Sequence, residues 1–207
     1  MKKRNNKEMD IVLLLDRSGS MSGLEDSTIC GYNSYLKSQC HNNVRVTTIL
    51  FDDKYEVLCR RKKIQEMMNL TRKEYYVRGS TALFDAIGCT INYLDRVKAK
   101  KVIFIIITDG LENSSVEYSK SKIRQLIQNH YKWEFMYIGA NIDSYIEGEK
   151  LGIKKDNISN YMKSKIGVKK LFSSIDKASE SFYCDGIISE VWKSDLDNYI
   201  DNNISFL

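Results

Sequence analysis

The residues best suited to chemistry in this chain are an aspartate and two serines that follow a short apolar run. Residues 11–15 are all apolar, and Asp16, Ser18 and Ser20 come after them at alternate positions. Five apolar residues in succession are typical of a strand that is buried on both faces of a sheet. Side chains at alternate positions of an extended loop can lean the same way. One carboxylate and two hydroxyls that converge there would begin an oxygen cage for a hard cation.

A second acid ends the most strongly apolar stretch of the chain. Residues 102–107 are an almost unbroken β-branched run, and Thr108, Asp109 and Gly110 follow it. Such a run predicts a central parallel strand. In open α/β sheets, ligands bind outside the carboxyl ends of the strands where the strand order reverses. The strands that end at Asp16 and Asp109 are therefore expected to be neighbours, although an Asp in this position can also cap the helix that follows.

A third group of polar residues lies in the segment Arg78-Gly79-Ser80-Thr81. The apolar positions 83, 86, 87, 91 and 94 come after it at helical spacing, which predicts an amphipathic helix. On this stretch alone we interpret Ser80 or Thr81 as the N-cap of that helix. The alternative is that the Thr81 hydroxyl faces a cation.

The rest of the chain continues an alternation of strands and helices. We expect helices over residues 25–40, 116–130, 142–151 and 168–182, and strands over 44–51, 55–59, 135–139 and 158–162. Residues 187–207 are expected to form a docked, partly helical tail with apolar anchors at Ile187, Ile188, Val191, Trp192, Leu196 and Tyr199. The short connection after residue 51 makes the third strand antiparallel to the second. The predicted fold is α/β: a doubly wound, mostly parallel six-stranded sheet with one antiparallel strand and helices on both faces. Residues 64–78 allow no assignment.

Two further acids, Asp52 and Asp53, stand between the second and third predicted strands. They could supply metal ligands, but acidic pairs commonly mark tight turns, and we interpret them as a turn. The basic cluster at residues 60–63 fits an edge strand that charge keeps from pairing with other chains.

Bulk properties indicate a globular protein. At 207 residues and 43% hydrophobic content, the chain is expected to form a single domain over 1–207 with its core at about 8–185. No segment approaches the roughly 20 apolar residues of a membrane span, and the N-terminal apolar run is too short for a signal peptide, so we expect a cytoplasmic location. The five scattered cysteines are expected to be small reduced core residues, and the two histidines to be solvated.

The net charge of +5 is concentrated at one end of the chain. Lys2, Lys3, Arg4 and Lys7 against Glu8 give residues 1–8 a charge of +3, which leaves +2 for the other 199 residues. No long basic stripe is interleaved with aromatic residues. We therefore expect no nucleic acid among the partners.

Taken together, Asp16-x-Ser18-x-Ser20, Thr81 in a Gly-Ser-Thr loop and Asp109 in Thr-Asp-Gly resemble the metal-ion-dependent adhesion site (MIDAS) of von Willebrand factor type A (vWA) domains. The resemblance covers roughly residues 8–185, and the segments Asp-Arg-Ser-Gly-Ser-Met and Gly-Ser-Thr-Ala-Leu are especially similar to bacterial members. It implies that Ser18, Ser20 and Thr81 bind the cation directly, and that Asp16 and Asp109 bind it directly or through water. Asn113 and Asp85 would support the site or satisfy loop amides.

The chemistry of these ligands agrees with the resemblance. Five oxygen donors with two formal negative charges balance a divalent ion, and Mg²⁺, or Mn²⁺, fits them better than Ca²⁺. No Cys or His belongs to the set, so we expect no soft metal at this site. The resemblance implies that an Asp or Glu carboxylate of a partner protein completes the coordination, with no catalysis; the oligomeric state stays open.

The main alternative is a Mg²⁺-dependent phosphoryl-transfer enzyme with Asp16 as the nucleophile. Against it, the position two residues on is Ser18 rather than a second acid, and no phosphate-clamping lysine is evident. No G-x-S-x-G turn surrounds Ser18, Ser20 or Ser22, which argues against a serine nucleophile. Residues 19–23 also lack the G-x-G-x-x-G spacing of a dinucleotide-binding site.

Overall fold

Apolar side chains on both faces of the central strands produce a sheet that is covered on both sides. The computed structural model describes residues 8–140 and 143–204. Its sheet has six strands in the order β3-β2-β1-β4-β5-β6, all parallel except β3, which is antiparallel to β2. The strands are β1 Met9–Asp16, β2 Val44–Phe51, β3 Tyr55–Lys63, β4 Val102–Thr108, β5 Glu134–Gly139 and β6 Ile158–Asn160. The predicted doubly wound sheet is confirmed.

The central pair of strands sets the position of the candidate site. β1 lies between β2 and β4, and Leu15 is level with Ile107 in the parallel pair. The chain leaves β1 toward β2 on one side and reaches β4 on the other, so the strand order reverses here. Asp16 and Asp109 therefore follow neighbouring strand ends, as predicted.

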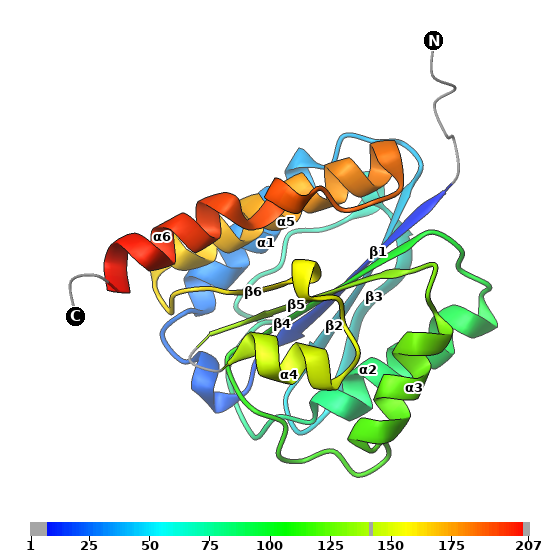
Figure 1. Ribbon diagram of the computed structural model, residues 1–207, viewed down its shortest axis with the longest axis horizontal. Helices are drawn as coiled ribbons and strands as arrows, with labels where there is room; N and C mark the ends of the chain where they lie inside the picture. The colour runs from blue at the N-terminus through cyan, green and yellow to red at the C-terminus, as the bar shows by residue number, and fades with distance from the viewer. Residues whose placement is uncertain (1–7, 141–142, 205–207) are drawn as a thin grey trace.

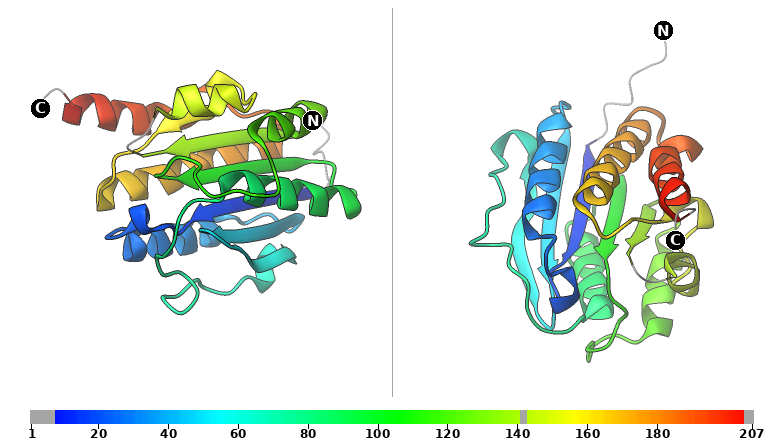
Figure 2. Two further views of the ribbon diagram at one scale, coloured as in Figure 1. Left: turned by 90° about the horizontal axis from the view of Figure 1, so that it is seen from below. Right: turned by 90° about the vertical axis from the view of Figure 1, so that its left-hand side faces the viewer.

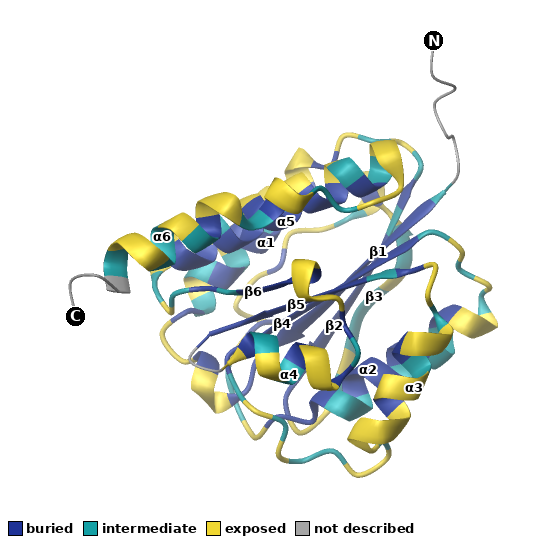
Figure 3. Ribbon diagram, in the orientation of Figure 1, coloured by how far each residue is buried: buried dark blue, intermediate teal, exposed yellow. Residues whose placement is uncertain are grey.

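Helices cover both faces of the sheet (Figures 1 and 2). One face carries α1 Glu25–Ser38, α5 Lys165–Asp185 and α6 Ser194–Ile204, and the other carries α2 Leu83–Arg96, α3 Lys120–Asn129 and α4 Ser144–Lys150. Ile11, Leu13 and Leu15 belong to the first apolar core, whereas Val12 and Leu14 belong to the second. Figure 3 shows the resulting pattern, with buried central strands between helices whose outer sides are exposed.

Several element ends differ from the predictions. β3 continues to Lys63, so the basic cluster at 60–63 lies on an edge strand. The third helix begins at Lys120 rather than 116, because Ser119 is its N-cap and accepts a hydrogen bond from the amide of Lys122. Part of the predicted helix at 142–151, residue 142, lies outside the described residues, as do 205–207 of the tail.

The tail docks through fewer anchors than predicted. A short 3₁₀ turn, η4 Glu190–Lys193, precedes α6. Trp192 and Leu196 are buried, and the indole N–H of Trp192 donates to the carbonyl of Asp156 at 2.8 Å. Ile187 and Val191 are exposed, so their predicted role as anchors is wrong.

The expectations for cysteine and histidine also need correction. None of the five cysteines is in a disulfide, but none is buried: Cys30, Cys40 and Cys184 are exposed and the other two are intermediate. His41 stacks on Tyr183 and pairs with Glu180, and His130 packs on Trp133 and pairs with Asp95, so neither ring is simply solvated. Among the described helices, none has the length and apolar character needed to cross a membrane.

Candidate metal centre

Asp16 ends β1 with a fully buried carboxylate whose two oxygens are both hydrogen-bonded. The amide of Ser18 donates to Oδ1 at 2.7 Å, and the hydroxyl of Thr108 donates to Oδ2 at 2.6 Å. These contacts fix the carboxylate at the boundary between β1 and β4. A buried, fully engaged carboxylate is poorly suited to act as a nucleophile, and no observation favours the phosphoryl-transfer alternative.

The two serines connect Asp16 to Asp109. The hydroxyls of Ser18 and Ser20 lie 2.9 Å apart, and the Ser20 hydroxyl donates to Asp109 Oδ1 at 2.5 Å. Ser20 belongs to the 3₁₀ turn η1 Gly19–Met21, which folds the loop back toward β4. The alternate spacing of Asp16, Ser18 and Ser20 thus brings all three to the edge of the sheet where Asp109 lies.

The position above Gly110 shows where the hydroxyls converge. A Cβ atom placed on Gly110 would lie 3.1 Å from Thr81 Oγ1, 3.2 Å from Ser20 Oγ and 3.9 Å from Ser18 Oγ. Three hydroxyls from two loops therefore surround a single point beside Asp109. The structure brings together all five residues singled out in the sequence.

The interpretation of Ser80 or Thr81 as a helix N-cap is wrong. The N-cap of α2 is Ala82, and no side chain at that position caps the helix. The first amides of α2 are satisfied from the loop after β4 instead, since Phe84 N donates to Glu112 and Asp85 N donates to Ser115. The Thr81 hydroxyl is thereby released from capping and can face the site.

Asn113 and Asp85 satisfy loop amides. The Asn113 side chain accepts from the amide of Thr81 at 2.9 Å, and its own amide donates to the Thr81 carbonyl at 3.0 Å. Asp85 accepts from three amides at residues 116–118. These bonds tie the Thr81 loop to the loop that carries Asp109.

A buried arginine, which the sequence did not single out, ties the loop after β1 to the turn between β2 and β3. Arg17 points away from its neighbours Asp16 and Ser18 and donates to Asp52 at 2.8 Å and to Glu56 at 2.5 Å. Arg78 donates to the same Asp52 oxygen at 2.8 Å. Asp52 is therefore committed to two arginines and is not available as a metal ligand, in agreement with the turn interpretation.

Tyr75 fixes the backbone at the end of β1. Its hydroxyl donates to the carbonyl of Asp16 at 2.7 Å from a fully buried position. Residues 64–78, which the sequence pattern left unassigned, contain only the short turn η2 Ile64–Glu66. In the sequence Tyr75 stands beside Tyr76 in a segment without hydrophobic periodicity, so no pattern marked its role.

The electrostatics of the site favour a cation. Burial raises the pKa of Asp16 to about 6, hydrogen bonds from Thr108 and Ser18 oppose this rise, and the charge of Asp109 adds to it. Asp109 Oδ2 is buried and, within the described residues, has no hydrogen-bond partner. Two buried acids, one of them with an oxygen that accepts no hydrogen bond, lie beside three hydroxyls and match the donor set of a hard divalent ion.

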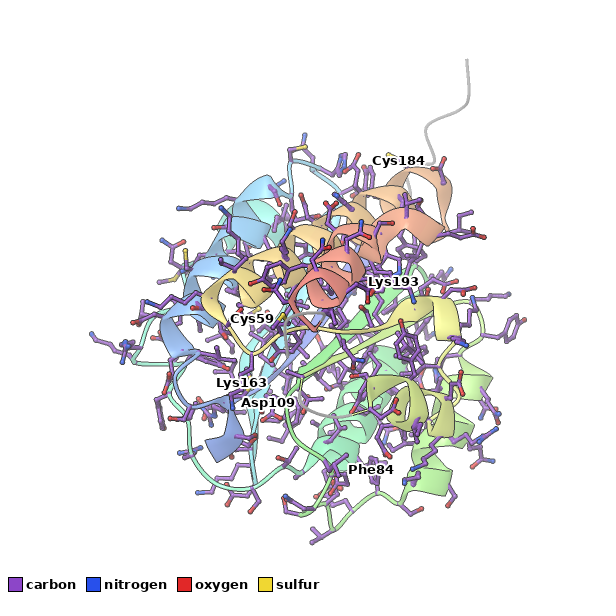
Figure 4. All side chains as sticks on the ribbon, turned by 60° about the vertical axis from the view of Figure 1, so that its left-hand side comes forward. Cys59, Phe84, Asp109, Lys163, Cys184 and Lys193 are labelled. Carbon is purple, nitrogen blue, oxygen red and sulfur yellow. The ribbon has the colours of Figure 1, made fainter. Side chains whose placement is uncertain are left out.

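One side chain of the opposite sign reaches this position. The amino group of Lys163, from the loop between β6 and α5, lies 2.8 Å from Asp109 Oδ2 as an ion pair without hydrogen-bond alignment. Figure 4 shows the two labelled residues next to each other.

Other features of the structure lie apart from these residues. No group of three or more His, Cys, Asp or Glu side chains with metal-binding geometry occurs in the described part of the chain, so the candidate set depends on hydroxyls. A cavity of about 1010 Å³ lies at the amino ends of the strands, where Asp10, Lys101 and Trp133 line it. It is at the opposite edge of the sheet from Asp16.

The strand order and the helices on both faces of the sheet match the Rossmann-like fold of vWA domains. Residues 1–132 match the family model described as VWA domain containing CoxE-like protein. The chain belongs to this family. Domains of the vWA class commonly mediate protein–protein interaction. No curated protein sequence matches the chain.

Solved structures share the fold at low sequence identity. The vWF domain of the type V pili tip protein Mfa5 from Porphyromonas gingivalis has a TM-score of 0.65 at 12% identity and covers 89% of this chain and 99% of its own. Manganese-loaded TRAP protein from Plasmodium vivax has a TM-score of 0.56 at 22% identity, covering 81% and 74%. Proximal thread matrix protein 1 from the mussel byssus has a TM-score of 0.60 at 15% identity; the match covers 83% of this chain and 48% of the mussel protein.

Proposed function

We propose that this chain is a protein-interaction module that binds a divalent cation at Asp16, Ser18, Ser20, Thr81 and Asp109, and that the cation captures a carboxylate of a partner protein. The observation that carries the proposal is the convergence of three hydroxyls beside Asp109, around the point above Gly110. Neutral oxygen ligands of this kind are not needed for a buried salt bridge, but they suit Mg²⁺ or Mn²⁺.

The neutral and the charged ligands would have different roles. The hydroxyls of Ser18, Ser20 and Thr81 would bind the cation directly, and the two aspartates would balance its charge, directly or through water. Because hydroxyls are neutral, the bound ion would keep affinity for a further anionic oxygen, and an Asp or Glu side chain of a partner would supply it. The manganese-loaded state of the Plasmodium vivax protein supports this choice of metal.

A metal titration of thermal stability tests the proposal. Mg²⁺ or Mn²⁺ at about one hundred times its Kd should stabilise the protein by about 2.7 kcal/mol, which for a chain of this size raises Tm by roughly 5–10 °C over the value in EDTA. Thr81→Val removes one hydroxyl at nearly constant volume and should abolish most of this rise.

Thr90→Val is the matched control. Thr90 is a buried threonine of α2 whose hydroxyl donates to the carbonyl of Ala86, away from the site. Its loss should lower Tm in EDTA and leave the metal-induced rise intact. Equal melting temperatures of the unaltered protein with metal and with EDTA would count against the proposal.

A further inference from the structure

Lys163 brings a cation of the chain itself into the candidate metal centre. It lies between β6 and α5, far in sequence from the loops that carry the site. Its amino group is 2.8 Å from Asp109 Oδ2 and also contacts the backbone carbonyl of Ser20. The ammonium thus contacts two of the residues proposed to hold the metal, of which Asp109 is labelled beside Lys163 in Figure 4.

The pairing of Lys163 with Asp109 is electrostatically useful but imperfect. The Asp109 side chain is fully buried, and a buried carboxylate without a counter-charge is costly. The Lys163 ammonium supplies that charge, yet Asp109 Oδ2 still lacks a hydrogen bond. A metal ion imposes no donor direction on a carboxylate oxygen, so it can satisfy Oδ2 where the ammonium does not.

We propose that Lys163 is a tethered competitor of the divalent cation: its ammonium occupies the Asp109 carboxylate and must leave when the metal binds. This inference rests on the proposed function and adds a means of regulating the same site. A divalent ion and an ammonium held on one carboxylate repel each other, most strongly in a partly buried site. Lys163 therefore lowers the metal affinity and sets the cation concentration at which the module becomes competent for its partner.

When the metal replaces the ammonium, only the side chain of Lys163 has to move, because the backbone around it is held in place. Ser164 caps α5 and accepts from the amide of Gly167 at 3.0 Å. A Cβ atom on Gly167 would lie only 2.0 Å from the carbonyl oxygen of Met162, so these two backbone segments are in direct contact. Tyr161, two residues before Lys163, is buried. The long lysine stem can swing away from Asp109 without moving the start of α5.

Calorimetric titration with Mn²⁺ tests this role. Lys163→Met keeps the length of the stem and removes the charge, and it should bind Mn²⁺ about tenfold more tightly than the unaltered chain. Lys165→Met is the matched control, because Lys165 is an exposed lysine two residues away at the first position of α5. Its Kd for Mn²⁺ should stay within about twofold of the unaltered value.

A melting experiment adds a readout that tighter packing alone would not give. In EDTA, Lys163→Met should melt below the unaltered chain because Asp109 has lost its counter-charge, whereas saturating Mn²⁺ should raise its Tm by more. Equal or weaker Mn²⁺ binding by Lys163→Met would overturn the role of Lys163 and leave the metal site standing. Failure of the unaltered chain and Lys163→Met alike to bind Mn²⁺ would overturn both proposals.

Discussion

At the scale of single residues, the site depends on a hydroxyl that is not needed as a helix cap. Thr81 precedes a helix and would ordinarily be used as its cap, but Glu112 and Ser115 satisfy the first amides of α2. Its hydroxyl is therefore free to face Asp109. Asn113 then fixes the Thr81 backbone through both its side chain and its amide. The loop after β4 thus supplies Asp109 and also places Thr81.

Gly110 provides a steric test at the same scale. In Gly110→Ala the new methyl group would lie 3.1 Å from Thr81 Oγ1 and 3.2 Å from Ser20 Oγ, closer than nearly all methyl contacts. We expect Mn²⁺ affinity to fall at least tenfold and the free energy of unfolding in EDTA to fall by about 1 kcal/mol. Calorimetry and urea unfolding measure the two effects.

Gly19→Ala is the control for this substitution. The nearest atom to a Cβ on Gly19 is the carbonyl oxygen of Gly79 at 3.5 Å, an ordinary contact. Gly19→Ala should therefore bind Mn²⁺ nearly as well as the unaltered chain. Unchanged Mn²⁺ affinity in Gly110→Ala would contradict the placement of the cation above Gly110.

The sequence was sufficient to identify the five candidate residues but not the residues that hold them. Side chains at alternate positions after an apolar strand are expected to point the same way, which is why Asp16, Ser18 and Ser20 could be grouped. Lys163 could not be found in this way, because its approach to Asp109 depends on how the β6–α5 loop packs across the sheet edge. Local pattern carries no information on contacts so distant along the chain.

At the scale of elements, the central feature is the pair of strand ends at β1 and β4. Their apolar runs predicted that they would be buried and parallel, and the Asp at each strand end predicted that they would be neighbours. The register places Leu15 opposite Ile107. Segment 64–78 was unpredictable because it has almost no regular structure and is held by individual contacts, such as that of Tyr75 with the Asp16 carbonyl. Hydrophobic periodicity detects repeated packing, and that segment has none.

The Arg17–Asp52–Arg78 cluster predicts how stability depends on pH. Burial acts to raise the pKa of Asp52, but hydrogen bonds from Arg78 and Lys54 and the charge of Arg17 outweigh it and hold the pKa below its usual value. The folded-state pKa is thus below the unfolded one. Asp52 then contributes stability above about pH 4 that is lost as the pH falls through the folded-state pKa.

Asp52→Asn should remove this contribution. It leaves Arg17 buried with a weaker partner, and we expect a loss of about 3 kcal/mol in the free energy of unfolding at pH 7, with a smaller loss at acid pH. Urea unfolding at several pH values measures both. Asp53→Asn, the neighbouring exposed acid, should change neither by more than about 0.5 kcal/mol. A loss in Asp52→Asn that did not depend on pH would refute the assignment.

At the scale of the whole molecule, two apolar cores cover the two faces of the sheet and leave the ends of its strands accessible for function. The carboxyl ends of the strands carry two buried acids and three hydroxyls, whereas the amino ends carry a cavity of about 1010 Å³ and no part of this set. The near-neutral charge of residues 9–207 provides no long-range field to offset the acids. Their charge must be balanced locally, by Lys163 or by a metal ion.

Anomalous diffraction from crystals grown in excess Mn²⁺ tests this account most directly. The predicted result is a single strong manganese peak at the carboxyl edge of the sheet, bound by the oxygens of Ser18, Ser20 and Thr81 with Asp16 and Asp109 beside it, and with the Lys163 amino group displaced from Asp109. A map with no manganese peak among these five residues would contradict the account.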